Sequence, residues 1–207
     1  MNPLVQQNPQ VSSGLPHYRS FSSSLATYER AARKEYILLM RNFAYTEQYP
    51  DFHVVIGFHK LMPIQDFSKI RNKAFGKLVK EGVKAYYVHE PSEAWIHIHA
   101  IAMYDGKISD LRKNIKESFT SAGLKYREDF HVKVKPINPT FTDYKRLCSY
   151  ILKFNGKRIS NRRVPDLFEK GSKLRKMGTI GKWFVKGKKV LWQEYRKELE
   201  QKHEQRD

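Results

Sequence analysis

The sequence has few cysteines and lacks both a long apolar run and a phosphate-binding loop. Its single cysteine, Cys148, cannot form an internal disulfide and is typical of a reducing compartment. No apolar run approaches the roughly 18 residues of a membrane-spanning helix, and residues 1–16 are polar, which predicts no signal peptide. Residues 178–182 are too short for a Walker A loop, so we expect no ATP-driven motor in this chain.

Positive charge dominates the composition. The 39 lysine and arginine residues outnumber the 21 aspartate and glutamate residues, which gives a formal net charge of +18 over 207 residues. This balance predicts a polyanionic partner, most often a nucleic acid and sometimes an anionic membrane. Hydrophobic residues make up 40% of the chain, which is enough for one core, so we expect one domain with appendages.

Hydrophobic periodicity predicts a series of helices and strands. Alternating apolar and polar residues indicate strands, whereas apolar residues three or four apart indicate helices. Asp66 is expected to cap the helix that it begins. The expected elements are a helix over 24–45, a strand over 52–60, a helix over 66–79, strands over 84–90 and 94–104, a helix over 109–122, a strand over 130–136, a helix over 142–154 and a C-terminal helix from about 189.

The order β-α-β-β-α-β predicts an α+β fold of the ferredoxin-like or RRM-like type. In this plan an antiparallel sheet carries both helices on one face, and the third strand is central. That strand here contains His97 and His99, and alternation places both of them with Ile101 on the opposite face, which we expect to be open. The expected organisation is a disordered tail over 1–22, a domain with its N-terminal helix over 23–156, and a basic C-terminal extension over 157–207 that ends in a helix.

His97 and His99 form a candidate metal site together with Glu90. In a hairpin that turns directly after Glu90, this residue pairs with Glu93 and lies on the same face as both histidines. Two imidazoles and a carboxylate, with positions open for water and phosphate, suit a divalent ion that acts as a Lewis acid. Glu93 and His89 are the alternative third ligands. The competing interpretation is a pair of polar side chains on a solvated strand.

Tyr150 is the candidate nucleophile. On the 142–154 helix it lies at the edge of an apolar stripe, with Arg146 one turn before it and Lys153 one turn after it. A hydroxyl between two cations is well placed to meet a phosphate. The competing interpretation is a tyrosine that packs with its hydroxyl in solvent.

Together these residues resemble the HUH endonucleases, which are the replication initiators and relaxases of plasmids and single-stranded DNA viruses. His97 and His99 flank a hydrophobic residue, as in the motif that names the family. Glu90 lies seven residues before the pair, where the replication-initiator branch has its acidic ligand. Tyr150 and Lys153 match the Tyr-x-x-Lys helix that follows in that branch. The resemblance covers about residues 52–156, although 53–58 match the family's first motif poorly.

The resemblance implies a single-tyrosine initiator of rolling-circle replication that acts on single-stranded origin DNA. A divalent metal, Mn²⁺ or Mg²⁺, on Glu90, His97 and His99 would polarise the scissile phosphate. Tyr150 would attack it, leaving a 5′-phosphotyrosine and a free 3′-hydroxyl, and the reverse step would join ends. Lys153 would steady the phosphate. The resemblance also implies a separate host helicase and polymerase, no membrane, and a place in the host cytoplasm, or in the nucleus of a eukaryotic host.

Basic residues on the last strand, on the 142–154 helix and beyond it are expected to bind DNA. Their charges would neutralise phosphates, and Trp183 and Phe184 would be available to stack on bases. The competing interpretation of the stretch after residue 154 is a solvated tail. The expected DNA contacts are Arg146, Lys133, Lys135, Lys157, Arg158, Arg162 and Arg163.

Other functions remain open. HUH relaxases use three histidines and a tyrosine near the N-terminus, for which Tyr28 and Tyr36 are the candidates, and HUH transposases add a glutamine ligand that this chain lacks after Tyr150. A non-catalytic RRM-like module would instead stack bases on strand aromatics such as Trp95 and Tyr104. Metal dependence separates the non-catalytic module from the cleaving enzymes, because cleavage needs the ion and simple binding does not.

Overall fold

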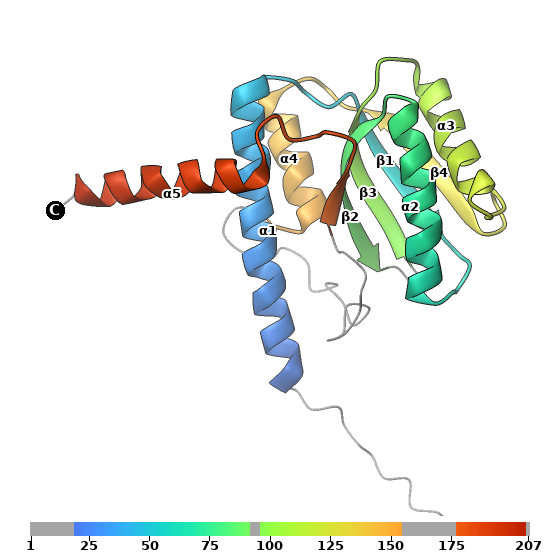
Figure 1. The fold of residues 1–207 in the computed structure, drawn as a ribbon, viewed down its shortest axis with the longest axis horizontal. Helices are drawn as coiled ribbons and strands as arrows, with labels where there is room; N and C mark the ends of the chain where they lie inside the picture. The colour runs from blue at the N-terminus through green and yellow to red at the C-terminus, as the bar shows by residue number, and fades with distance from the viewer. Residues whose placement is uncertain (1–18, 92–95, 155–176, 206–207) are drawn as a thin grey trace, which may run out of the picture.

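The computed structural model describes residues 19–91, 96–154 and 177–205. These residues form an α+β fold of the ferredoxin-like type, with one five-stranded antiparallel sheet and five helices (Figure 1). The elements are α1 (Arg19–Thr46), β1 (Phe52–Phe58), α2 (Ile64–Lys80), β2 (Lys84–Pro91), β3 (Ile96–Met103), α3 (Ile108–Ser121), β4 (Phe130–Pro136), α4 (Phe141–Leu152), β5 (Met177–Ile180) and α5 (Lys188–Glu204).

The strand order in the sheet is β4-β1-β3-β2-β5. Its first four strands have the order expected of a ferredoxin-like sheet, with β3 between β1 and β2. The sequence did not predict β5, which pairs with the outer edge of β2 and places Gly178 opposite Tyr87. A four-residue strand that follows a basic stretch carries too little alternation to be recognised.

One face of the sheet is covered by α2 and α3, as expected (Figure 1). Alternate residues of the strands point to these helices, including Ile56 on β1 and Ile98 on β3, and both are buried. Phe67 and Phe119 bring aromatic rings from the helices to Phe58 on β1. The period-two pattern therefore predicted this core correctly.

The other face is not open along its whole length, which corrects the sequence prediction. Ile101, assigned to solvent, is 0% exposed, and α1 and α4 pack on this side of the sheet (Figure 1). The apolar stripe of α1, which includes Tyr28 and Leu39, is buried against α4 and this part of the sheet. Trp183 is buried in the same cluster, and Phe184 packs against this cluster. The prediction that Trp183 is available to stack on bases is therefore wrong.

The ends of two helices differ from the prediction. Asp66 does not cap α2, because the helix begins earlier, after Pro63, and Asp66 lies in its first turn. Thr140 caps α4 by accepting a hydrogen bond from the backbone N–H of Asp143 at 3.2 Å. At its other end α4 stops at Leu152, because Lys153 adopts a left-handed conformation with φ 53°.

Across the described ranges, none of the helices combines the length and hydrophobicity that crossing a bilayer requires.

Candidate active site

The register of the β2–β3 hairpin places Glu90 directly opposite His97. The predicted pairing of Glu90 with Glu93 is wrong, because β2 continues to Pro91 and β3 begins only at Ile96. The register differs by an even number of residues, so every side chain keeps its face, and Glu90 still shares a face with both histidines. Glu93 lies outside the described residues.

The Glu90 carboxylate joins a strand histidine to the end of α4. Its Oε2 atom lies 2.9 Å from Nε2 of His99 and 3.0 Å from Nζ of Lys153. Burial favours a higher pKa for Glu90, but the hydrogen bonds from His99 and Lys153 outweigh it and lower the pKa to about 2. The carboxylate is therefore ionised at neutral pH and shared between the two donors.

Tyr150 lies at the edge of this cluster with its side chain 49% exposed. Its ring centre is 5.6 Å from that of His99, nearly edge to face, and Nζ of Lys153 lies 4.1 Å from the centre of the tyrosine ring. The left-handed turn at Lys153 lets the ammonium reach back over Tyr150 and on to Glu90. The structure thus brings together a phenol, an imidazole, a cation and a carboxylate that the sequence separates by up to 63 residues.

His97 is the second histidine of the expected metal site. It is half-buried, and its ring centre lies 6.1 Å from that of His99. Burial lowers the pKa of His97, and the neighbouring His99 and His131 lower it further, although Glu90 opposes them. The neutral imidazole keeps a lone pair for a metal ion or a proton.

The carboxylate of Glu90 and the imidazoles of His97 and His99 are kinds of ligand that bind divalent ions, but they are not arranged around a common point. Over the ranges that the structure describes, no three His, Cys, Asp or Glu side chains converge to hold a metal ion. Glu90 instead contacts His99 directly, and Lys153 supplies the positive charge beside it. One ionised carboxylate and two imidazoles on one face are nevertheless ligands that divalent metals accept.

Sequence reasoning missed His53, which lies beside His99. Its Nε2 atom is 3.5 Å from Nδ1 of His99, and the two rings stack with centres 5.7 Å apart. Burial lowers the pKa of His53 to about 4, and the neighbouring His99, Lys135 and Lys153 lower it further. Alternation along β1 puts His53 on the histidine face, and this signal would have placed it there once β1 was paired with β3.

A second pair of histidines, neither of which was expected to be a site residue, continues across the same face. His131 on β4 lies 6.1 Å from His97 between ring centres, and its Nδ1 atom is 2.8 Å from Nε2 of His59. Gly57 makes room for this arrangement, because a Cβ atom there would come within 2.2–2.9 Å of the His131 ring. The histidines therefore form a row over β1, β3 and β4.

The expected DNA-binding residues fall into two groups. Lys133 and Lys135 are exposed on β4, on the histidine face, and Lys135 pairs with His53 across the strands. Arg146 is exposed on α4, one turn before Tyr150. The remaining predicted contacts, Lys157, Arg158, Arg162 and Arg163, lie outside the described residues.

Several alternative residues lie away from this cluster. His89, the fallback ligand, is 2% exposed on the other face of the sheet between the rings of Phe67 and Tyr87, which rules it out as a ligand here. Tyr28 and Tyr36, the relaxase candidates, are both buried, and the Tyr28 hydroxyl donates to the Leu152 carbonyl at 3.0 Å. Tyr104, proposed for base stacking, packs instead against the core under α2 and α3, and its hydroxyl accepts a hydrogen bond from Asn114. Trp95 lies outside the described residues.

Comparisons with known proteins assign neither a family nor a function to this chain. No protein-family model and no curated protein matches the chain. One similar solved structure is the crystal structure of the hypothetical protein ORF119 from Sulfolobus islandicus rod-shaped virus 1. It is 15% identical, with a TM-score of 0.36, and the match covers 60% of this chain and 92% of that one.

Proposed function

We propose that this protein nicks and rejoins single-stranded DNA through Tyr150, as a replication initiator of the HUH type. The observation that carries the proposal is the position of Tyr150. It is an exposed tyrosine whose ring lies 5.6 Å from His99 and under the Lys153 ammonium, and both of these residues bind Glu90. This cluster combines a nucleophile with groups that bind phosphate and accept protons.

The proposed reaction is a transesterification. The Tyr150 oxygen forms a bond to the scissile phosphorus, and the bond from phosphorus to the 3′ oxygen breaks. The phenol loses a proton and the leaving 3′ oxygen gains one, so the strand ends in a free 3′-hydroxyl and a 5′-phosphotyrosine. Because one phosphodiester replaces another, no water is consumed and the reverse reaction can join ends.

Each residue of the cluster has a role in this proposal. Lys153 reaches Tyr150 from its ring face, so its ammonium can stabilise negative charge on the phenolate or on the phosphate. Glu90 holds Lys153 and His99 in place. His53 stacks on His99 and contacts its other ring nitrogen, which orients the imidazole.

A divalent ion, Mn²⁺ or Mg²⁺, is part of the proposal through Glu90, His97 and His99. A bound ion would supply Lewis-acid polarisation of the phosphate. Glu90 is ionised and His97 is held neutral, which are the states that ligands need. Lys153 already balances the Glu90 charge, so we expect metal binding to be weak without DNA.

A relaxase is the second candidate, and one observation favours it. His53 is a third imidazole beside His99, and three histidines are the relaxase ligand set. The relaxase tyrosine fits less well, because Tyr28 and Tyr36 are buried whereas Tyr150 is exposed beside the histidines. We therefore favour the initiator, which would act at an origin with a separate host helicase and polymerase, in the cytoplasm or in the nucleus of a eukaryotic host.

The test is a covalent-adduct assay with Mn²⁺. Single-stranded oligonucleotides with a randomised centre carry a fluorophore at the 3′ end, because the 5′-phosphotyrosine retains the 3′ fragment. The wild-type protein should give a labelled band on a denaturing gel, and Tyr150→Phe should give none. Tyr45→Phe is the matched control, since Tyr45 is 47% exposed and lies away from the histidines, bonded to Glu194. An adduct in Tyr150→Phe would refute the assignment, and binding without any adduct would favour the non-catalytic module.

A further inference from the structure

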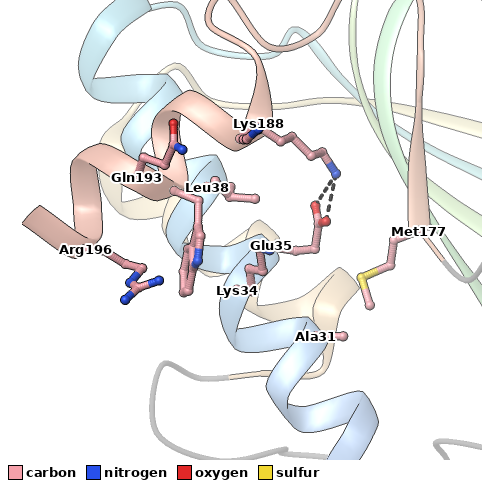
Figure 2. Close-up of a pocket in the computed structure, with 10 residues that line it drawn as sticks. Ala31, Lys34, Glu35, Leu38, Met177, Lys188, Gln193 and Arg196 are labelled. Carbon is pink, nitrogen blue, oxygen red and sulfur yellow. Dashed lines mark hydrogen bonds and ion pairs between the residues drawn. The ribbon is translucent and has the colours of Figure 1, made fainter.

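A pocket of about 600 Å³ lies between α1 and α5, beside β5 (Figure 2). This volume falls within the roughly 300–1,000 Å³ of most small-ligand sites. Its described lining contains none of the residues of the candidate active site. The residues that matter for its chemistry are Lys34 and Glu35 of α1, and Lys188, Lys189, Trp192 and Arg196 of α5.

The pocket keeps an excess of positive charge after its internal ion pair is counted. Both Glu35 oxygens contact Nζ of Lys188, at 2.6 and 2.8 Å, and Glu35 also accepts a hydrogen bond from the Tyr86 hydroxyl at 3.0 Å. Figure 2 shows this pair on one side of the pocket and Arg196 on the other. Lys34, Lys189 and Arg196 are exposed. Arg196 also forms an exposed ion pair with Glu200 at 3.7 Å, and such surface pairs are weak enough for an anion to compete with them.

The start of α5 adds to this positive potential. Lys188 and Lys189 are the first residues of the helix, and its first turn contains no acidic residue. Gly187 precedes them and offers no capping side chain. The first turn of α5 therefore adds no carboxylate of its own to offset the partial positive charge of the helix N-terminus, and the nearby Glu35 comes from α1 and is bound by Lys188. This end of the pocket suits an anion such as phosphate.

Trp192 gives the pocket an aromatic surface. Its side chain is half-buried in the lining, and Nζ of Lys34 lies 4.9 Å from the ring centre. A base that stacked on the indole would displace this ammonium, which could then contact the attached phosphate. Aromatic stacking beside a row of cations is the general way in which proteins hold single-stranded nucleic acid.

From these contacts we propose that the α1–α5 pocket binds a nucleotide of single-stranded DNA. The base stacks on Trp192, and Lys189 and Arg196 bind the flanking phosphates. The inference rests on the proposed function only for the class of ligand, since no step of the nicking reaction takes place here. It gives the protein a second DNA-binding site, apart from Tyr150.

The test is binding of a fluorescein-labelled dT20 strand, read by anisotropy in EDTA. The full-length protein carries Tyr150→Phe so that no cleavage intervenes. Trp192→Ala should weaken binding about five-fold or more, whereas Trp192→Phe, which keeps a stacking ring, should stay within about two-fold. Lys189→Glu and Arg196→Glu should also weaken binding, and each should lower the salt slope by about 0.7 for every phosphate that the variant no longer neutralises.

Lys73→Glu is the control for charge reversal, because Lys73 is exposed on α2, over the opposite face of the sheet. It should change affinity less than Arg196→Glu does. Parental affinity in both Trp192→Ala and Arg196→Glu would overturn the proposal. So would a change in oligomeric state on Arg196→Glu, by analytical ultracentrifugation, with DNA binding unchanged, because the occupant would then be a second copy of the chain.

The same variants separate this inference from the proposed function. If the wild-type protein forms no adduct but Trp192→Ala loses dT20 affinity, the pocket proposal is supported and the nicking proposal is refuted. If Trp192→Ala and Arg196→Glu both bind dT20 as their parent does while the wild-type protein still forms the adduct, the pocket proposal is overturned and the nicking proposal is kept.

Discussion

Oε2 of Glu90 lies 2.9 Å from Nε2 of His99, across two neighbouring strands. The same oxygen receives the Lys153 ammonium at 3.0 Å from the end of α4. One carboxylate oxygen therefore connects the central strand to the segment that carries Tyr150. The candidate active site depends on this connection, since it links the candidate nucleophile to the histidine face.

Breaking this connection should destabilise the protein. Glu90→Gln removes the charge that Lys153 and His99 share, and removing a hydrogen bond to a charged group costs about 1.5–3 kcal/mol. Lys153→Met should cost a similar amount because it leaves Glu90 without its cation. Urea unfolding of the two single variants and the double variant forms a cycle, in which the double variant should lose less than the sum. Strictly additive losses would show that the two side chains do not interact.

Two substitutions at Lys153 can separate the effect of its charge from the effect of its backbone conformation. A non-glycine residue at φ 53° is strained by about 1 kcal/mol or more, and glycine is not. Lys153→Gly and Lys153→Ala both lose the ammonium, but the glycine variant should be more stable by about 1 kcal/mol in urea unfolding. Both should lose most of the adduct formation. Full activity in the more stable glycine variant would exclude an electrostatic role for Lys153.

We expect metal-dependent cleavage to require His97. His97→Ala should lose the Mn²⁺-dependent, EDTA-sensitive cleavage of single-stranded DNA, because one of the proposed ligands is gone. Its affinity for DNA in EDTA should stay within about two-fold of wild type, since other basic residues bind the phosphates. His203→Ala, an exposed histidine in the last turn of α5, is the matched control. Unchanged cleavage in His97→Ala would remove this residue from the site.

Cys148 should be inert in the folded protein. Burial raises the pKa of its thiol to about 12, although a hydrogen bond with Tyr144 opposes the shift. A raised folded-state pKa means that the reactive thiolate is nearly absent at pH 8. A thiol-reactive chromophore should label the native protein very slowly at pH 8 and one thiol rapidly in guanidinium chloride. Fast native labelling would show that α4 opens from the sheet.

Residues close in sequence were the part of the site that could be predicted. The spacing of His97 and His99 on a strand, and of Tyr150 and Lys153 at the end of a helix, follows from local periodicity. Glu90 kept its predicted face even though its pairing partner was wrong, because an even shift in register leaves faces unchanged. Period-two alternation is thus a stronger predictor of which face a residue occupies than of which residue it meets.

Contacts between distant segments could not be predicted in this way. His53 meets His99 only because β1 pairs with β3, and His131 lies near them because β4 pairs with the other edge of β1. The burial of Ile101 and Trp183 depends on α1 and α4 packing over the sheet. No local pattern specifies which apolar stripe covers which strand, because many pairings bury similar apolar area.

Short-range periodicity was enough to predict the α+β order, the core under α2 and α3 and the candidate nucleophile, because each of these follows from the spacing of neighbouring residues. Tertiary packing was needed to bring Lys153 back to Glu90, to add His53 to the cluster, and to enclose a basic pocket between α1 and α5. These contacts join residues that are 46 to 153 positions apart. They form only when whole helices and strands pack together, because no pattern within one segment specifies them.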